Sequence, residues 1–184
     1  MKSILIFLVI LIIPSLTFAG DYKTLILGES EDVTTQKFVT LAKNGEIKLK
    51  DKGLYTKVLN YDVEIYPGFF DKKLYSIELY FPKSDVSADV EYMIEDEIKP
   101  MFMKVYGKPT KEFDHPSTLD LSPGYLSYCY QWIFQNKTII IGVTKDVGGD
   151  LSTCGAEIMI LDTKLAKARE VSKLKMQMES GKDF

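Results

Sequence analysis

The sequence predicts an α+β protein in which antiparallel β-meanders are packed by helices. Apolar residues recur at every second position in several segments, which is the pattern of half-buried strands. In three other segments they recur every three to four positions, which is the pattern of amphipathic helices. Turn-forming residues separate these segments, and their order is helix, strands, helix, strands, helix. The sequence therefore predicts a helix-plus-meander plan used twice, followed by a C-terminal helix.

Residues 1–19 have the features of a secretory signal peptide. Lys2 supplies a positive charge, residues 4–13 are all apolar, and small residues end at Ala19 before Gly20. The apolar run is short for a membrane span. We expect cleavage before Gly20 and a soluble protein that is periplasmic or secreted. Because the residue after the expected cleavage site is not cysteine, a lipid-anchored lipoprotein is disfavoured.

A lead-in strand (residues 22–27) and a short helix are predicted next. Phe38 and Leu41 recur at helical spacing, and Asn44–Gly45 is the kind of pair that ends a helix. The acidic residues after Gly28 suit the helix N-terminus, where the backbone N–H groups point outward.

The β-rich stretch that follows predicts a hairpin. Apolar residues alternate with polar ones over residues 55–65 and again over residues 75–81, so each range is expected to form one antiparallel strand. A turn beginning at Pro67–Gly68 joins the two strands. Phe69 and Phe70 are then expected at the tip of the hairpin.

A long second helix is predicted over residues 86–105, capped by Asp85 or Ser87. Its apolar residues form one stripe, which is typical of a helix that packs on a sheet. Pro100 removes one backbone hydrogen bond, so we expect a kink or break there. Gly107 ends the element.

Three strands (residues 128–134, 138–143 and 156–161) and a last helix (residues 162–179) complete the prediction. The first two strands are expected to meet at a tight turn at Asn136–Lys137. Four aromatic residues share one parity in the first of these strands: Tyr128, Tyr130, Trp132 and Phe134.

Length and charge predict one domain (residues 20–162) with a basic tail (residues 163–184). The domain contains 16 lysines and 23 acidic residues, whereas the tail contains 6 basic and 3 acidic residues. Arg169 is the single arginine of the chain, and nucleic-acid surfaces use arginine heavily, so a nucleic-acid partner is disfavoured. We expect contact with a membrane only as a peripheral contact of the basic C-terminal helix.

Cys129 and Cys154 are the only cysteines, and an oxidising compartment favours one disulfide between them. The alternative is two buried thiols. A turn at Asn136–Lys137 would place the cysteines two strands apart, roughly 9 to 10 Å, which is more than the about 7 Å that a disulfide spans. We therefore expect the loop at Gly148–Gly149 to curl Cys154 back over the sheet.

No motif indicates catalysis, a cofactor or a metal. His115 is the single histidine and lies in a turn-like stretch, so it is interpreted as a solvated loop residue rather than part of a triad. Asp146 and Asp150 do not have the spacing of a calcium loop. Acidic residues of the second helix are interpreted as a wet face: Glu91, Glu95, Asp96 and Glu97. We expect a protein that is not an enzyme and binds no cofactor or metal.

Aromatic residues are the candidate partner-binding residues. Tyr128, Tyr130 and Trp132 would form a recognition platform if the helix covered the other face of their strand, and otherwise they would form the core face. Phe69 and Phe70 are the second candidate surface, with an inward orientation as the alternative.

Three short stretches carry a family resemblance. They are residues 27–33 before the first helix, residues 105–109 (VYGKP) after the second, and Trp132 in a meander. Together they resemble small Gram-negative envelope proteins with helix-plus-meander domains, such as the SmpA/OmlA type of outer-membrane assembly lipoprotein and the β-lactamase-inhibitor-like fold. This resemblance implies a binding or scaffolding role without catalytic residues. The lipidated cysteine of such lipoproteins is absent after the signal.

The resulting expectation is an exported, non-enzymatic binding or accessory protein of the cell envelope that recognises a protein partner through a sheet face or loops. An immunity or inhibitor protein directed against a toxin or enzyme is one alternative. A hydrolase that uses carboxylates is the other, and a cleft holding two acids from different elements would support it.

Overall fold

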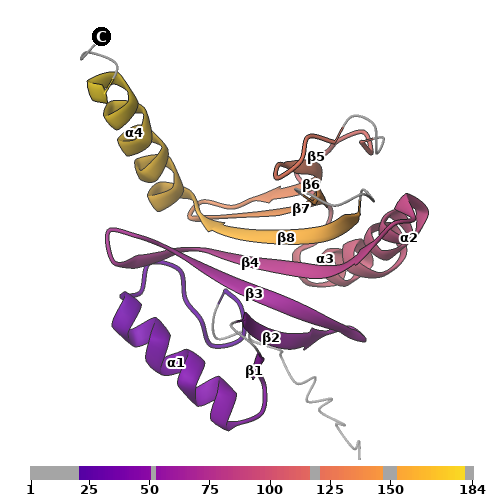
Figure 1. The fold of residues 1–184 in the computed structure, drawn as a ribbon, viewed down its shortest axis with the longest axis horizontal. Coiled ribbons are helices and arrows are strands. Elements are labelled where there is room, and N and C mark those ends of the chain that lie inside the picture. Colours follow the sequence, from indigo (N-terminus) through magenta and orange to yellow (C-terminus); the bar gives the residue numbers. More distant parts are fainter. Residues whose placement is uncertain (1–20, 51–52, 117–120, 147–152, 181–184) are drawn as a thin grey trace, which may run out of the picture.

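The computed structural model describes residues 21–50, 53–116, 121–146 and 153–180, which form an α+β fold around one eight-stranded antiparallel sheet (Figure 1). The strands are β1 (Lys48–Lys50), β2 (Gly53–Val58), β3 (Tyr61–Phe70), β4 (Lys73–Ser84), β5 (Lys111–Glu112), β6 (Leu126–Ile133), β7 (Lys137–Lys145) and β8 (Cys154–Asp162). The helical elements are α1 (Glu31–Lys43), α2 (Ser87–Tyr92), the π-helical η1 (Met93–Ile98), α3 (Lys99–Tyr106) and α4 (Thr163–Ser180). The predicted signal peptide and the expected Gly148–Gly149 loop lie outside the described residues.

Two meanders form the sheet, as the sequence predicts. The strand order is β1-β2-β3-β4-β8-β7-β6-β5, and each neighbouring pair is antiparallel. Helix α1 precedes the first meander, and the α2–η1–α3 run precedes the second. The last strand of each meander, β4 and β8, pairs with the other at the centre of the sheet.

The two faces of the sheet differ in burial, because side chains alternate between the faces of a strand. Directly paired residues share a face, so the register gives one cross-strand row of buried residues: Ile65, Leu79, Ile158, Ile141 and Tyr130. We call this side the helix face. The next row belongs to the other side, which we call the open face: Glu64, Tyr80, Glu157, Gly142 and Tyr128.

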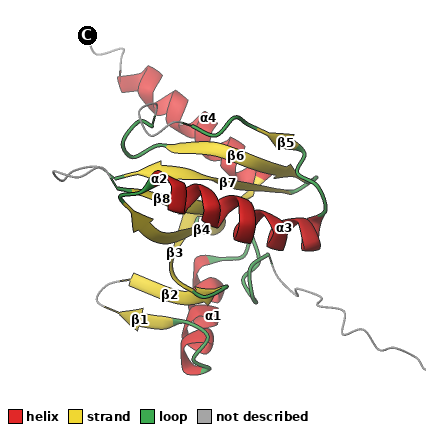
Figure 2. Ribbon diagram, turned by 90° about the vertical axis from the view of Figure 1, so that its right-hand side faces the viewer, coloured by secondary structure: helices red, strands yellow, loops and turns green. Residues whose placement is uncertain are grey.

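The α2–η1–α3 run lies in front of strands β4, β8, β7 and β6 in Figure 2. Its buried residues are spaced along one stripe: Val90, Met93, Ile94, Ile98 and Phe102. Trp132 of β6 is almost fully buried, and its indole Nε1–H donates a 2.9 Å hydrogen bond to the carbonyl of Gly107, just after α3. The helix therefore packs on the helix face and is fixed there at its C-terminal end.

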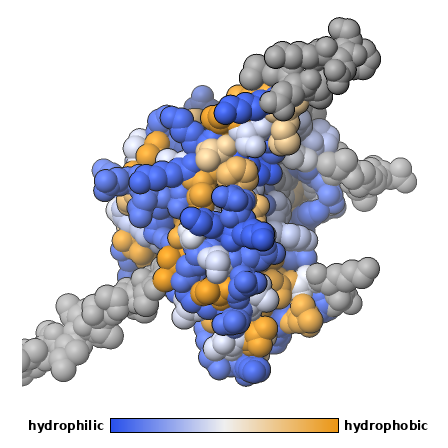
Figure 3. Space-filling model, turned by 90° about the vertical axis from the view of Figure 1, so that its left-hand side faces the viewer, coloured by the Kyte–Doolittle hydropathy of each residue, from blue (hydrophilic) through white to orange (hydrophobic). Residues whose placement is uncertain are grey.

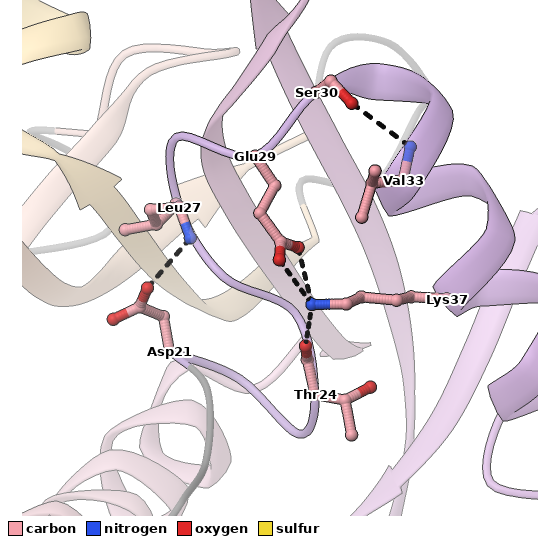
Figure 4. Close-up of polar contacts among 7 residues, drawn as sticks. All are labelled: Asp21, Thr24, Leu27, Glu29, Ser30, Val33 and Lys37. Atoms are coloured by element: carbon pink, nitrogen blue, oxygen red, sulfur yellow. Dashed lines mark hydrogen bonds and ion pairs between the residues drawn. The ribbon is translucent and has the colours of Figure 1, made fainter.

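Helix α1 has the predicted ends. The Ser30 hydroxyl accepts a hydrogen bond from the Val33 N–H, and Asn44 is the C-cap. The left-handed residue after the cap is Gly45, with φ of 74°. In Figure 4, the Lys37 ammonium donates to both carboxylate oxygens of Glu29, at 2.6 and 2.7 Å, and to the Thr24 carbonyl at 2.8 Å.

The segment before α1 is an irregular loop rather than the predicted strand. Tyr22 and Leu25 form one isolated bridge. The Asp21 carboxylate accepts a hydrogen bond from the Leu27 N–H at 2.9 Å (Figure 4) and forms an ion pair with Lys137 of β7 at 3.0 Å. Side-chain contacts therefore fix this segment against the second meander.

The hairpin prediction is wrong about the positions at which the chain reverses. Residues 55–65 form parts of two strands, β2 and β3, because the chain reverses at Leu59–Asn60, where Leu59 has φ of 55°. Pro67–Gly68 lies inside β3 at a β-bulge, and the reversal occurs at Asp71–Lys72, where both residues have positive φ. Phe69 and Phe70 therefore end β3 instead of occupying the tip.

Near Pro100, where the sequence predicts a kink or break, the chain does not break but departs from α-helical geometry. The chain stays helical from Ser87 to Tyr106, and the six residues before Lys99 are π-helical. Since Pro100 has no N–H to donate to the preceding turn, a wider turn there leaves fewer backbone groups unpaired. Gly107 ends α3 with φ of 77°, as predicted.

Helix α4 extends away from the body (Figure 1). Its contacts with the sheet involve β4 and β8, and the Arg169 guanidinium lies 4.9 Å from the centroid of the Tyr75 ring. Beyond that point its apolar side chains are exposed, including Val171, Leu174 and Met176. Within the described part of the chain, no helix combines the length and apolarity that crossing a membrane requires.

The predicted Cys129–Cys154 disulfide is absent from the structure. Both cysteines are buried free thiols. Cys129 lies on β6 and Cys154 on β8, and β7 separates these strands. Two strand spacings of about 4.8 Å exceed the reach of a disulfide, as expected from the strand register. Cys154 is the first residue of β8 and does not lie in a loop that returns over the sheet, which is the arrangement that the disulfide would have required.

Candidate functional site

A polar cluster lies between η1 and β6 on the helix face. The Tyr130 hydroxyl donates to Glu95, and the Lys99 ammonium donates to the Glu95 carboxylate at 3.0 Å and to the Tyr130 oxygen at 2.9 Å. His115 Nε2 lies 2.7 Å from the Glu95 carboxylate. The Lys99 ammonium also lies 4.2 Å from the centroid of the Tyr130 ring, which is a cation–π contact. We call these four residues the Glu95 cluster.

Two backbone irregularities bring the Glu95 cluster together. Glu95 belongs to the π-helical turn η1, and Tyr130 follows a bulge in β6 at Cys129. Gly142 on β7 permits the close approach of the bulged strand, because a Cβ there would collide with the backbone oxygen of Ser127. Bulges and π-helical turns both re-aim side chains and are common at functional sites.

The electrostatics of the Glu95 cluster favour a charged carboxylate. Partial burial opposes ionisation of Glu95, but hydrogen bonds from Tyr130 and Lys99, with the charges of Lys99 and His115, hold the pKa of Glu95 below its usual value. The hydrogen bond to Tyr130 is the main cause that raises the pKa of Lys99 to about 12. Each ionised group of the cluster therefore has a partner. These contacts hold the helical run, strand β6 and the segment of His115 together.

A cavity of about 320 Å³ borders this cluster at His115 and is also lined by Glu91, Ser87 and Cys154. The neighbouring Cys129 is a poor nucleophile, because burial, with the charges of Glu95 and Glu91, raises the pKa of its thiol to about 12.

The structure separates the aromatic residues that the sequence groups together. Tyr130 and Trp132 are buried on the helix face, at 4% and 1% exposure, whereas Tyr128 is 42% exposed on the open face. The bulge at Cys129 inserts one residue, which reverses the alternation of β6 and places Tyr128 on the other side. Phe69 is partly buried against the core, so it is not a presented tip, and Phe70 is of intermediate exposure.

The open face carries an exposed aromatic group and a carboxylate pair. Tyr128 packs edge-on against Phe113, with ring centroids 5.9 Å apart, and Tyr66 packs edge-on against Tyr80 at 5.2 Å. The Tyr80 hydroxyl donates to Glu78 at 3.2 Å. Glu157 is the paired neighbour of Tyr80 on the adjacent strand and is 2% exposed.

Glu157 is an unusual residue for its position. Its Oε1 atom has no hydrogen-bond partner among the described residues. Burial, followed by the negative charge of Glu78, raises the pKa of Glu157 to about 7, although a hydrogen bond from Tyr80 partly opposes this. A buried carboxyl without full hydrogen bonding is costly, so its retention on the open face marks a candidate site.

An apolar cavity of about 280 Å³ lies on the helix face between α3 and the N-terminal segment. Its floor is formed by Leu79, Ile158 and Ile160, and Tyr22 and Phe102 lie on its walls. Neither of the two buried polar side-chain atoms that lack a hydrogen-bond partner among the described residues belongs to its lining.

Metal binding finds no support in the part of the chain that the structure describes, where no group of three or more His, Cys, Asp or Glu side chains could hold an ion. Of the two aspartates considered for calcium, Asp146 pairs with Lys83 at 2.8 Å, and Asp150 lies outside the described residues.

The sequence patterns missed both carboxylate sites. Glu95 and His115 were interpreted as solvated residues, yet each is partly buried and they pair with each other. The available signal was Pro100, whose predicted distortion lies beside Glu95. Glu157 carried a clearer signal, because it is the single charged residue inside the apolar strand of residues 156–161.

The comparisons with known proteins return no match: no family model, no curated protein and no solved structure resembles the chain. The resemblance to small envelope proteins therefore stays an expectation from short sequence stretches.

Proposed function

We propose that the chain is an exported binding protein that recognises a protein partner through the open face of its sheet. The observation that carries this proposal is the asymmetry of the sheet. The helix face is buried under α1 and the α2–η1–α3 run, whereas the open face presents Tyr66 at 47% and Tyr128 at 42% exposure. Tyrosine combines a large apolar surface with a polar end and is enriched in protein interfaces.

The surface chemistry supports a reversible protein contact. Figure 3 shows the side of the molecule opposite to that of Figure 2, where hydrophobic residues occur as separate patches between hydrophilic ones. The binding surface of a protein that also has to stay soluble without its partner has this mixed character. The excess of acidic residues over lysines within residues 20–162 favours a basic partner, because opposite charges accelerate association. Export rests on the signal-like residues 1–19 of the sequence.

The proposal is tested with a photo-reactive phenylalanine placed at one of two exposed tyrosines. Position 128 lies on the open face, and the matched control position 92 lies on the helical run and is 58% exposed. In producing cells, irradiation is expected to link one protein stoichiometrically through position 128 and not through position 92. With the photo-reactive residue at position 128, the substitution Tyr66→Lys on the same face should abolish this capture. Linkage through position 92 alone would show that the helical side is the binding surface.

An inhibitor or immunity protein is a special case of this proposal, and the identity of the linked protein decides it. A carboxylate-dependent hydrolase is the second candidate, because Glu78 and Glu157 come from different strands and a carboxyl pKa of about 7 suits a general acid. Glu78 does not line the cavity beside Glu157, which is why binding ranks first. Hydrolysis of a panel of chromogenic glycosides and esters, lost in both Glu78→Gln and Glu157→Gln, would replace the binding proposal.

A further inference from the structure

We propose that the cavity beside Glu157 receives a cationic side chain, an arginine or a lysine, of the protein partner. This inference rests on the proposed function and names the chemistry that the open face recognises. It starts from the cavity itself, which has a volume of about 250 Å³ and is lined by open-face residues of β4, β8 and β7, with Leu126 of β6. The size suits a guanidinium or ammonium group with part of its methylene stem.

Glu157 is the group that selects a cation. Glu157 lines the cavity, its exposure is 2%, and its Oε1 atom lacks a hydrogen-bond partner within the described chain. An ionised carboxylate offers only acceptor positions, so the missing partner must be a donor. A guanidinium or ammonium supplies both the donor and the opposite charge, and charge-assisted hydrogen bonds are the stronger kind.

The surroundings of Glu157 favour an organic cation over other ligands. Glu78 adds a second negative charge, and Tyr80, an aromatic residue of the kind that attracts cations, is among the lining residues. The Lys83 ammonium at the same cavity is paired with Asp146 at 2.8 Å. A metal ion is disfavoured because the described residues offer no group of three suitable ligands. The methylene stem of a lysine or arginine also matches the apolar Leu126 and Met159 in the lining.

Cation binding at this cavity is expected to depend on pH. Burial and Glu78 raise the pKa of Glu157 to about 7, so its ionised form is lost as the pH falls below 7. The Tyr80 hydroxyl stays neutral throughout, because burial and the two carboxylates raise its pKa well above the usual value. Lys83, Lys145 and Asp146 are the other charged residues that line the cavity. Affinity for a cation should therefore rise from pH 5.5 to pH 8.

The test uses N-acetyl-arginine amide as the probe and its uncharged isostere, N-acetyl-citrulline amide, as the matched ligand. Amide NMR signals of the isotope-labelled protein are followed during titration at pH 8 and pH 5.5. We expect saturable shifts at Glu157, Thr144 and Tyr80 with the arginine probe only, and an affinity roughly tenfold or more lower at pH 5.5. Glu157→Gln should abolish these shifts, whereas Glu64→Gln, the carboxylate next along the same cross-strand row, should keep them.

Equal shifts with the citrulline probe, absent shifts at pH 8, or unchanged arginine binding in Glu157→Gln would each overturn the inference. The result is separable from the proposed function. Arginine binding without any protein linked through position 128 would leave the cavity assignment standing and remove the protein partner. A partner linked equally by the wild-type chain and by Glu157→Gln would keep the proposed function and remove this inference.

Discussion

At the scale of single residues, two tyrosines of β6 that are separated only by Cys129 have opposite roles. Tyr130 is buried and joins the Glu95 cluster, whereas Tyr128 is exposed on the open face and contacts Phe113. The bulge at Cys129 alone accounts for this difference. Side-chain alternation is a strong predictor only when a strand is regular, and one inserted residue inverts every assignment beyond it.

The two tyrosines give a matched pair of substitutions. Tyr130→Phe removes the hydroxyl that donates to Glu95 and accepts from Lys99, and leaves both charged groups with a lost partner. We expect the free energy of unfolding to fall by about 1 to 3 kcal/mol. Tyr128→Phe should change it by less than about 0.5 kcal/mol. Urea denaturation of both variants at pH 7 measures the difference, and equal stabilities would show that the Glu95 cluster does not clamp the helix to the sheet.

The chemistry of the site was therefore only partly predictable from residue types. Glu95 sits in a run of acidic residues and His115 beside a proline, and both contexts are typical of solvent-exposed positions. Their pairing depends on a helix turn and a segment far apart in the chain. Such contacts leave no trace in local patterning, because local patterning records only which face of its own element a residue occupies.

At the scale of elements, the strongest predictions were those with many repeats of one pattern. The three strands of the second meander, α1 and α4 occur near their predicted positions. Turns were less predictable, since Leu59, Asp71 and Lys72 adopt positive φ although none is a glycine. Pro67 was interpreted as a turn and instead lies in β3, where it is paired with Ile77 next to a bulge. Tertiary pairing overrode the local preference in these places.

The separation of the cysteines by β7 yields a chemical prediction. The purified protein, denatured without reductant, is expected to react with two equivalents of iodoacetamide, and the folded protein with none, because both thiols are buried. Intact mass spectrometry counts the added groups. A denatured protein that remains unmodified and is two mass units lighter than the reduced chain would show a Cys129–Cys154 bond and would require β6 and β8 to approach each other.

At the scale of the whole molecule, the last strand joins the two meanders into one sheet. β8 is the final strand in sequence yet lies at the centre of the sheet, between β4 and β7. Helix α4 follows it and leaves its apolar side chains exposed beyond the first turns. The C-terminal helix and the strand before it should therefore differ sharply in their importance for folding.

Two truncations test this difference. A chain ending at Asp162 lacks α4 and keeps all eight strands, so we expect it to melt cooperatively within a few degrees of the full chain. A chain ending at Lys145 lacks β8, exposes β4 and β7, and should not melt cooperatively. Circular dichroism during heating distinguishes the two results. Loss of cooperative melting in the first truncation would show that α4 belongs to the core.

The two edges of the sheet have a consequence for how a partner can attach. The edge strands are β1, with three residues, and β5, with two. Strand β1 carries lysine at positions 48 and 50, and strand β5 carries lysine at position 111. Short, charged edges cannot accept an added strand from another chain, which protects a strand-rich protein against edge-to-edge aggregation. They also disfavour recognition by strand addition. A partner bound as proposed would therefore be held by side chains on the open face, without an extended segment that pairs with an edge strand.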